Sequence, residues 1–267
     1  MLKQQQSRKR KRRPNSGYIL MSQPKEKRSY TYKALNRVLG KALHRYDMIV
    51  HGDRIVVGLS GGKDSLTLMW FLFERLARVP IEYELYPVYV DPGFEGGFGE
   101  ELEAWCRNKG YPLRVEYTDF GLVAHSRENR ENPCFLCSRL RRKRLFEIAD
   151  ELNCDKLALG HHKDDIIETL FMNMCYAGEI STMKPSQSFF KGKFTVIRPL
   201  AYADEDSIRR FARSMDFPEF VNPCPTAGES KRHEVKEMLK KLYRSNKKIK
   251  GNIFRSMSHV REDYLLK

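Results

Sequence analysis

A glycine-rich turn between two apolar segments constrains the fold of this chain more than any other feature. The turn reads Gly-Leu-Ser-Gly-Gly-Lys-Asp-Ser over residues 58–65. Before it, Arg54–Gly58 has the compact apolar pattern of a buried strand, and after it Ser65–Val79 has the pattern of a largely apolar helix. The start of a helix presents free N–H groups and a partial positive charge, which attract phosphate. The turn therefore predicts a phosphate-binding loop.

The residue types of the turn suit a nucleotide. Gly61 and Gly62 lack side chains, so the backbone can close around an anion. Asp64 would repel bare phosphate, but it can cap the helix or help to hold Mg²⁺. The turn is not a Walker A loop, because Val57 stands where that motif has its first glycine and Asp64 replaces Ser or Thr. The expected phosphate contacts in the turn, which become ATP contacts if the family resemblance given below holds, are Leu59, Ser60, Gly61, Gly62, Lys63, Asp64 and Ser65.

Short apolar segments continue to alternate with helical patterns after the turn. Strands are expected at 83–90, 113–117 and 156–160, and helices at 100–109, 138–152 and 164–176. This alternation predicts an α/β fold with an open parallel sheet and helices on both faces. A hairpin with a glycine turn over 188–198 and helices near 204–215 and 229–244 are expected to follow.

The charge is unevenly distributed along the 267 residues. The formal net charge is +15, and residues 1–28 alone contain ten Lys or Arg and one Glu. We expect a disordered basic tail over 1–28, an N-terminal helix over 29–50, a nucleotide-binding domain over 51–225 and a C-terminal helical segment over 226–267. No apolar run approaches the roughly 20 residues that cross a bilayer. We therefore expect a cytoplasmic protein without a membrane partner.

A second polar motif follows the strand expected at 156–160. It reads Gly-His-His-Lys-Asp-Asp over residues 160–165. Ligands of open α/β sheets bind at the carboxyl ends of the strands, so Gly160 is expected beside the phosphate loop. The paired Asp164 and Asp165 suit Mg²⁺ or proton transfer, although Asp164 could instead cap the next helix. Val90, which ends another strand, is expected to lie by the adenine.

Three of the six cysteines suggest a metal site. Cys134 and Cys137 form a C-x₂-C pair, and Cys224 stands between two prolines. Zinc with His161 or His162 as fourth ligand is one option, and a [4Fe–4S] cluster with one open iron is the other. The remaining cysteines, in apolar helical or strand-edge contexts, are expected to be buried core residues: Cys106, Cys154 and Cys175.

A basic cluster follows the cysteine pair. It comprises Arg139, Arg141, Arg142, Lys143 and Arg144. Such a cluster suits an RNA phosphate backbone, and we expect contacts from Arg139, Arg141, Arg142 and Arg144. Neighbours on a helix lie about 100° apart, so only a subset can face RNA. The alternative is a solvated helix face that pairs with Glu147 and Asp150.

The motifs carry a family resemblance. The phosphate loop and the Gly-His-x-x-Asp-Asp stretch resemble the PP-loop ATP pyrophosphatases, which have a HUP-type fold and split ATP between the α and β phosphates. Together with Pro-Cys-x-x-Cys-Ser-Arg-Leu-Arg-Arg, Ile-Arg-Pro-Leu and Pro-Cys-Pro, their order resembles the tRNA 2-thiocytidine synthetase family over about Tyr32–Ser245.

The resemblance implies an activity. ATP adenylates the base carbonyl of the cytidine at position 32 of tRNA, and sulfur comes from a [4Fe–4S] cluster on Cys134, Cys137 and Cys224. It also implies Mg²⁺, a sulfur donor (a cysteine desulfurase or inorganic sulfide), a homodimer, and a catalytic set of Lys63, Asp64, Asp164 and Asp165.

Three alternatives stay open. Related 2-thiouridine enzymes carry zinc-finger cysteines at both ends, whereas the earliest cysteine here is Cys106, which favours the cytidine branch. A small-molecule PP-loop synthetase would not explain the three cysteines or the basic cluster. A zinc-binding RNA module without enzymatic activity would not explain the phosphate loop.

Overall fold

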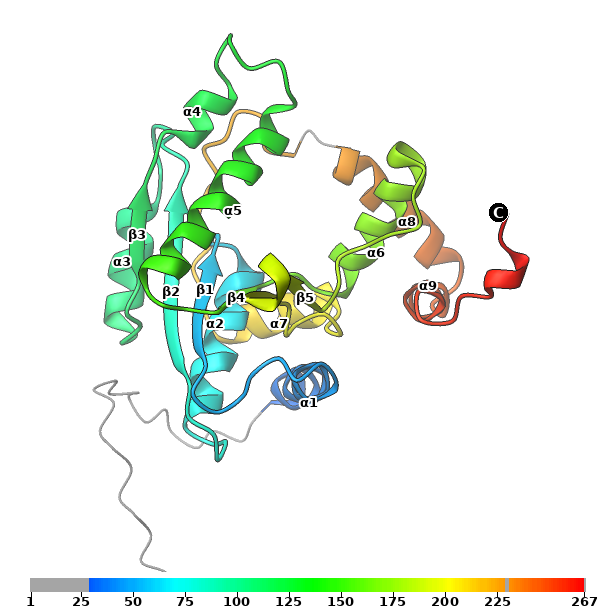
Figure 1. Cartoon of the computed structure of the whole chain (residues 1–267), viewed down its shortest axis with the longest axis horizontal. Coiled ribbons are helices and arrows are strands. Elements are labelled where there is room, and N and C mark those ends of the chain that lie inside the picture. The colour runs from blue at the N-terminus through cyan, green and yellow to red at the C-terminus, as the bar shows by residue number, and fades with distance from the viewer. Residues whose placement is uncertain (1–28, 229–230, 267) are drawn as a thin grey trace, which may run out of the picture.

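The computed structural model describes residues 29–228 and 231–266, and the expected basic tail lies outside this range. A six-stranded sheet with the order β3-β2-β1-β4-β6-β5 forms the centre (Figure 1). The strands are β1 (Arg54–Leu59), β2 (Glu84–Asp91), β3 (Arg114–Tyr117), β4 (Lys156–Leu159), β5 (Ser186–Phe189) and β6 (Phe194–Ile197). Neighbouring strands are parallel except for the antiparallel β5–β6 pair. The predicted fold class and the hairpin are confirmed.

Helices cover both faces of the sheet. They are α1 (Tyr30–Arg45), α2 (Lys63–Leu76), α3 (Gly99–Asn108), α4 (Phe120–Ala124), α5 (Pro133–Glu151), α6 (Lys163–Met172), α7 (Glu205–Ser214), α8 (Lys231–Ser245) and α9 (Ile249–Ser256). Successive side chains of β1 point to opposite faces of the sheet, so the strand contributes to the core on each face. Ile55 and Val57 join the core formed with α1, α2 and α7, whereas Val56 joins the core beneath α5.

The C-terminal helices pack beside the sheet rather than over it (Figure 1). Val235 and Leu239 of α8 form a small apolar cluster with Ile167 of α6, and Phe254 of α9 packs against it. Helix α6 begins directly after β4, so this cluster holds the C-terminal segment next to the carboxyl edge of the sheet.

Two expectations were wrong in detail. The helix expected from residue 138 begins at Pro133, because the Asn132 side chain accepts a hydrogen bond from the Phe135 N–H (3.2 Å) and Pro suits a first turn. Cys134 and Cys137 therefore lie within the helix and not in a loop before it. Cys175 is exposed, because it lies in the π-helical turn that follows α6, where none of the residues is buried. Cys106 and Cys154 are buried as expected.

Candidate active site

The phosphate loop connects β1 to α2 and is shaped by its own hydrogen bonds. The Ser65 hydroxyl accepts a hydrogen bond from the Ser60 N–H (3.1 Å) and donates one to the Gly62 carbonyl (2.9 Å). Gly61 has a φ of +74°, and a Cβ there would lie 2.4 Å from the Phe98 ring. Only glycine meets both conditions, so the loop depends on this residue for its shape.

The second motif lies against the first. A Cβ on Gly160 would come within 2.9 Å of the Ser65 nitrogen, so the β4–α6 turn touches the start of α2. Two residues after Gly160, His162 is 4% exposed and has three carboxylates around it. Its ring nitrogens lie 3.4–3.7 Å from oxygens of Asp64, Asp164 and Asp165. The structure thus brings the expected carboxylates of both motifs together.

Lys63 contacts two carboxylates at the start of α2. Its Nζ lies 3.1 Å from Asp64 Oδ2 and 3.2 Å from Oε1 of Glu205, the first residue of α7. Burial would raise the pKa of Glu205, but hydrogen bonds and attraction from Lys236 and Lys63 lower it to about 2. Glu205 is therefore an ionised part of the site. Sequence reasoning missed it because an acidic residue in a first helical turn is ordinary.

The two aspartates of α6 already have partners within the chain. Asp165 caps α6, accepting a hydrogen bond from the His162 N–H (2.9 Å), and it lies 3.4 Å from Arg232. Asp164 accepts a hydrogen bond from the Glu205 N–H (2.9 Å) and forms an ion pair with Lys250. The capping role considered for Asp164 thus belongs to Asp165.

One oxygen of Asp64, which lies 3.7 Å from His162 Nε2, takes part in no hydrogen bond among the described residues. This oxygen, Oδ1, is buried. Within the same part of the chain, no three His, Cys, Asp or Glu side chains are placed to hold a metal ion. Magnesium characteristically takes one or two carboxylates and completes its shell with phosphate and water. This Asp64 oxygen fits that kind of site.

A cavity of about 440 Å³ opens beside the phosphate loop. The loop forms one wall, Arg209 and Arg213 of α7 contribute two cations, and Phe217–Phe220 forms the far side. The Phe220 ring stacks on Phe98 with centroids 4.8 Å apart, next to Gly61. The size of this cavity suits a nucleotide, and its lining contains three cations (Lys63, Arg209 and Arg213) and three acidic residues (Asp64, Asp216 and Glu219).

Val90 lies near this edge, but its side chain faces away. It is 1% exposed and belongs to the core beneath α5. The next residue, Asp91, accepts a hydrogen bond from the Gly93 N–H (2.8 Å) and shapes the turn after β2. A contact between Val90 and adenine would therefore have to come from the backbone.

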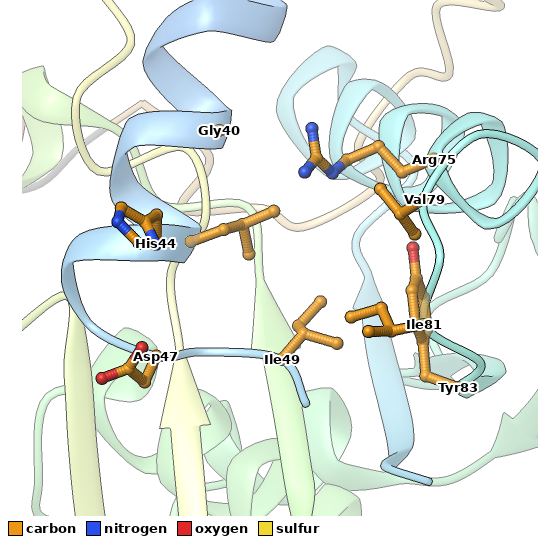
Figure 2. A pocket seen from close by; sticks show the side chains of 9 residues that line it. Gly40, His44, Asp47, Ile49, Arg75, Val79, Ile81 and Tyr83 are labelled. Carbon is orange, nitrogen blue, oxygen red and sulfur yellow. The ribbon is translucent and has the colours of Figure 1, made fainter. Parts of the chain in front are cut away.

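A separate cavity of about 170 Å³ lies between α1 and α2 (Figure 2). Arg75 and Tyr83 line it together with Gly40 and His44. Burial lowers the pKa of Arg75, whose guanidinium reaches Asn36 Oδ1 at 3.5 Å. This cavity lies at the C-terminal end of α2, at the opposite end from the phosphate loop, so it is not part of the nucleotide site.

Two of the three expected cysteines lie around one threonine hydroxyl, and the third is their electrostatic neighbour. The sulfurs of Cys134 and Cys224 each lie 3.5 Å from Thr226 Oγ1. Burial raises the pKa of the Cys137 thiol, Arg141 opposes that rise, and the nearby Cys224 and Cys134 add to it. Cys134 is exposed and the other two are half-buried. Three thiols are the kind of donor set that a [4Fe–4S] cluster takes, although the described side chains are not yet arranged as a three-ligand metal site.

The histidine beside the cysteines is His125, which sequence reasoning missed. Its Nε2 lies 4.0 Å from Cys224 Sγ and 3.1 Å from Thr226 Oγ1, and its Nδ1 lies 2.9 Å from the Gly121 carbonyl. His161 and His162, considered as zinc ligands, instead lie with the aspartates of the phosphate-loop region. No spacing rule indicated His125, because it lies outside every helix and strand expected from the sequence.

The basic cluster on α5 divides into paired and unpaired members. Arg144 contacts three glutamates, Glu116 (2.6 Å), Glu147 (3.2 Å) and Glu151 (2.8 Å). Arg139 and Lys143 each contact one glutamate. Arg141 is half-buried near Cys137, and its Nε has no hydrogen-bond partner among the described residues. Arg142 is exposed, and no ion pair involves it in that part of the chain.

Comparisons with known proteins agree with this geometry. The PP-loop domain family matches residues 31–239, so the fold and the phosphate loop define a PP-loop protein. The tRNA-cytidine(32) 2-sulfurtransferase of Geotalea uraniireducens is 39% identical, covering 86% of this chain and 92% of its own. That of Geobacter sulfurreducens is 37% identical, covering 88% and 93%. The chain therefore belongs to the tRNA-cytidine(32) 2-sulfurtransferase family, and the expected enzyme class, a sulfurtransferase, is confirmed.

Two solved structures extend the comparison. The U34-tRNA thiolase NcsA from Methanococcus maripaludis with its [4Fe–4S] cluster has a TM-score of 0.73 and 27% identity, covering 88% of this chain and 80% of its own. The NH₃-dependent NAD synthetase from Campylobacter jejuni has a TM-score of 0.50 and 13% identity, covering 88% and 95%, and shares the fold. Among the described residues, no helix is long and apolar enough to cross a membrane.

Proposed function

We propose that this enzyme uses ATP to replace the 2-oxygen of cytidine 32 in tRNA by sulfur. The observation that carries the proposal is the joining of two sites by one segment. Phe220 stacks on Phe98 beside the phosphate loop, and Cys224, four residues later, lies with Cys134 around Thr226. A phosphate site and a thiol site so connected suit a reaction that activates an oxygen and then replaces it with sulfur.

The first step is activation of the base. A cytosine carbonyl is a poor electrophile because its ring nitrogens donate electrons into it. The carbonyl oxygen attacks the α-phosphorus of ATP, the bond to the β-phosphate oxygen breaks, and pyrophosphate leaves. The N–H groups at the start of α2 and the Lys63 ammonium would stabilise the charge that develops on the phosphates. Mg²⁺ on Asp64 Oδ1 would neutralise phosphate charge.

The second step replaces the activated oxygen. A sulfur nucleophile attacks the ring carbon, the carbon–oxygen bond breaks, and AMP leaves with that oxygen. A [4Fe–4S] cluster on Cys134, Cys137 and Cys224 would supply an iron without a protein ligand, at which sulfide can be held. Arg141, half-buried beside Cys137, is placed to hold negative charge near the thiols. Asp164 and Asp165 would hold Lys250 and Arg232 in place at the same site.

The target base must leave its stack to enter this site. Bases of a single-stranded loop do so at low cost, which fits an anticodon-loop cytidine. Arg139, Arg141 and Arg142 are proposed contacts for the flanking phosphates. We leave Arg144 out, because three glutamates already hold its guanidinium. A homodimer, a cytoplasmic location and a sulfur donor (a cysteine desulfurase or inorganic sulfide) also remain proposals.

Anaerobic reconstitution tests the proposal. The protein, supplied with iron and sulfide, is incubated with ATP, sulfide and tRNA, and the nucleosides are analysed by mass spectrometry. We expect 2-thiocytidine, AMP and pyrophosphate, with no product from a tRNA that carries uridine at position 32. ADP and phosphate would contradict the adenylation step. Thiolation by a zinc-loaded protein without iron would contradict the cluster, and 2-thiouridine at position 34 would move the enzyme to the uridine branch.

A further inference from the structure

The positive charge of the chain outside its first 28 residues is concentrated at the C-terminal end. Residues 29–230 contain 27 Lys or Arg and 29 Asp or Glu, so this part is slightly acidic. Residues 231–267 contain 12 Lys or Arg and four Asp or Glu. The nucleotide-binding domain thus offers little net attraction to a polyanion, whereas the segment with α8 and α9 offers a great deal.

One set of these C-terminal cations faces inward and is paired with the site. Arg232 lies 3.4 Å from Asp165, and Lys236 lies 2.9 Å from Glu205. Lys250 of α9 contacts Asp164 and lies 3.1 Å from Asp204. Together with the apolar contacts of α8 on α6, these ion pairs fix both helices against the carboxylates beside the phosphate loop.

A second set faces solvent. Its members are Lys241, Arg244, Lys247, Lys248 and Arg255, which we call the C-terminal basic surface. All five are exposed, and within residues 29–228 and 231–266 none of them takes part in an ion pair. Lys241 and Arg244 are one helical turn apart on α8, and the others follow around the bend into α9. Like charges at this density repel one another unless a polyanion neutralises them.

The α5 cluster offers a contrast. Three of its five cations are paired with glutamates, so an RNA backbone would have to displace those partners. Phosphates could contact the C-terminal basic surface without displacing any carboxylate from its cations. The surface also lies on α8 and α9, whose inward cations Lys236 and Lys250 contact Glu205 and Asp164 of the phosphate-loop region.

We propose that the C-terminal basic surface binds the sugar–phosphate backbone of the tRNA substrate. This inference rests on the proposed function, since it assumes that tRNA is the substrate. The surface holds the tRNA by its phosphates through contacts that do not depend on sequence, while the target base reaches the site. Anionic lipid headgroups offer the same charge, but helices that contact the carboxylates of the phosphate-loop region, in a family that modifies tRNA, favour RNA.

Salt-dependent tRNA binding by the full chain tests this assignment. The variant Lys241→Gln/Arg244→Gln/Lys248→Gln removes three cations of the surface. The matched control, Lys33→Gln/Arg37→Gln/Lys109→Gln, removes three exposed cations from α1 and the C-terminal end of α3. Each phosphate contact contributes about 0.7–0.9 to the slope of log affinity against log salt. We expect the surface variant to lower the slope by about two and the control to leave it unchanged.

Several outcomes would overturn the assignment. A surface variant with the wild-type slope would do so, as would a slope that falls only when residues 1–28 are deleted, since the tail would then be the anchor. Binding to vesicles of anionic lipid with no binding to tRNA would also do so. An assay of thiolation by the wild type separates the two proposals. If the wild type makes 2-thiocytidine and the surface variant keeps the wild-type salt slope of tRNA binding, only this inference is contradicted. Thermal unfolding of each variant shows that it is folded.

Discussion

The phosphate loop and the cysteine site are built in opposite ways. The loop is a run of eight consecutive residues whose shape depends on its own hydrogen bonds and on one glycine with positive φ. The cysteine site combines Cys134 and Cys137, at the start of α5, with Cys224, which lies 87 positions after Cys137 in the chain. A local site is recognisable from its sequence, whereas an assembled site depends on the segments that bring its parts together.

The two sites also differ in electrostatics. The phosphate-loop region is a network of ion pairs. Glu205, for example, contacts three cations: Lys63, Lys236 and Arg209. The cysteine site has hydrogen bonds around Thr226 and His125 instead. Substitutions in the first region should therefore change charge-dependent properties, and those in the second should change metal content.

The largest effect is expected at the cysteines. Cys224→Ala, like Cys134→Ala or Cys137→Ala, removes one of three proposed ligands, so both cluster absorbance and thiolation should be abolished. Cys175→Ala is the matched control, because Cys175 is exposed and lies on another element. Iron and sulfide content and the yield of 2-thiocytidine are the measurements. Equal loss in the control would mean that the assembled site is wrongly assigned.

A smaller effect is expected at the phosphate loop. Lys63→Ala removes a cation at the start of α2, and a loss of one such stabilising group costs about 100- to 1000-fold in kcat. Cluster content should equal that of the wild type, because Lys63 contacts Asp64 and Glu205 and no cysteine. The exposed Lys184→Ala is the control. Release of pyrophosphate and iron content are measured in parallel, and loss of iron from Lys63→Ala would show that the two regions are not separable.

The smallest effect concerns stability and pH. Burial raises the pKa of Glu168 in α6 to about 7, nearby Asp165 adds to the rise, and Lys236 opposes it. The folded state then binds more protons than the unfolded chain between about pH 4.5 and 7, so this contribution to stability is present at low pH and lost as pH rises through 7.

Glu168→Gln removes that ionisation. We expect its free energy of unfolding to exceed that of the wild type at about pH 8 by up to about 3 kcal/mol, and to show no gain near pH 4.5. Chemical unfolding at both pH values is the measurement, with the exposed Glu95→Gln as the control. A wild type and a Glu168→Gln variant with parallel pH dependence would mean that Glu168 titrates normally.

Much of the fold was predictable because its determinants are local. The apolar run of β1, the glycine turn and the helix after it are neighbours in sequence, and the parallel order follows from the alternation of strands and helices. The hairpin was predictable from its glycine turn. The start of α5 was not, because the Asn132 cap and the N-terminal Pro133 stood before the helical pattern that begins at residue 138.

The partners of the site residues were not predictable in the same way. His125, Glu205 and the inward cations of α8 and α9 carry no motif, and their roles come from contacts between elements far apart in the chain. The arginines of α5 look alike in sequence, yet one is held by three glutamates and another lies beside a cysteine. Ion pairs over a few ångströms depend on where helices pack, which no spacing reports.

The sequence by itself determined the phosphate loop, the sheet and the three cysteine positions, since each rests on residue types and their local spacing. Only the tertiary structure decided which side chains surround them, which cations remain free for a partner and which carboxylates lie around His162. The physical reason is the separation along the chain over which each property is set. Backbone conformation responds to neighbours within a few residues, whereas burial and ion pairing respond to the packing of the whole chain.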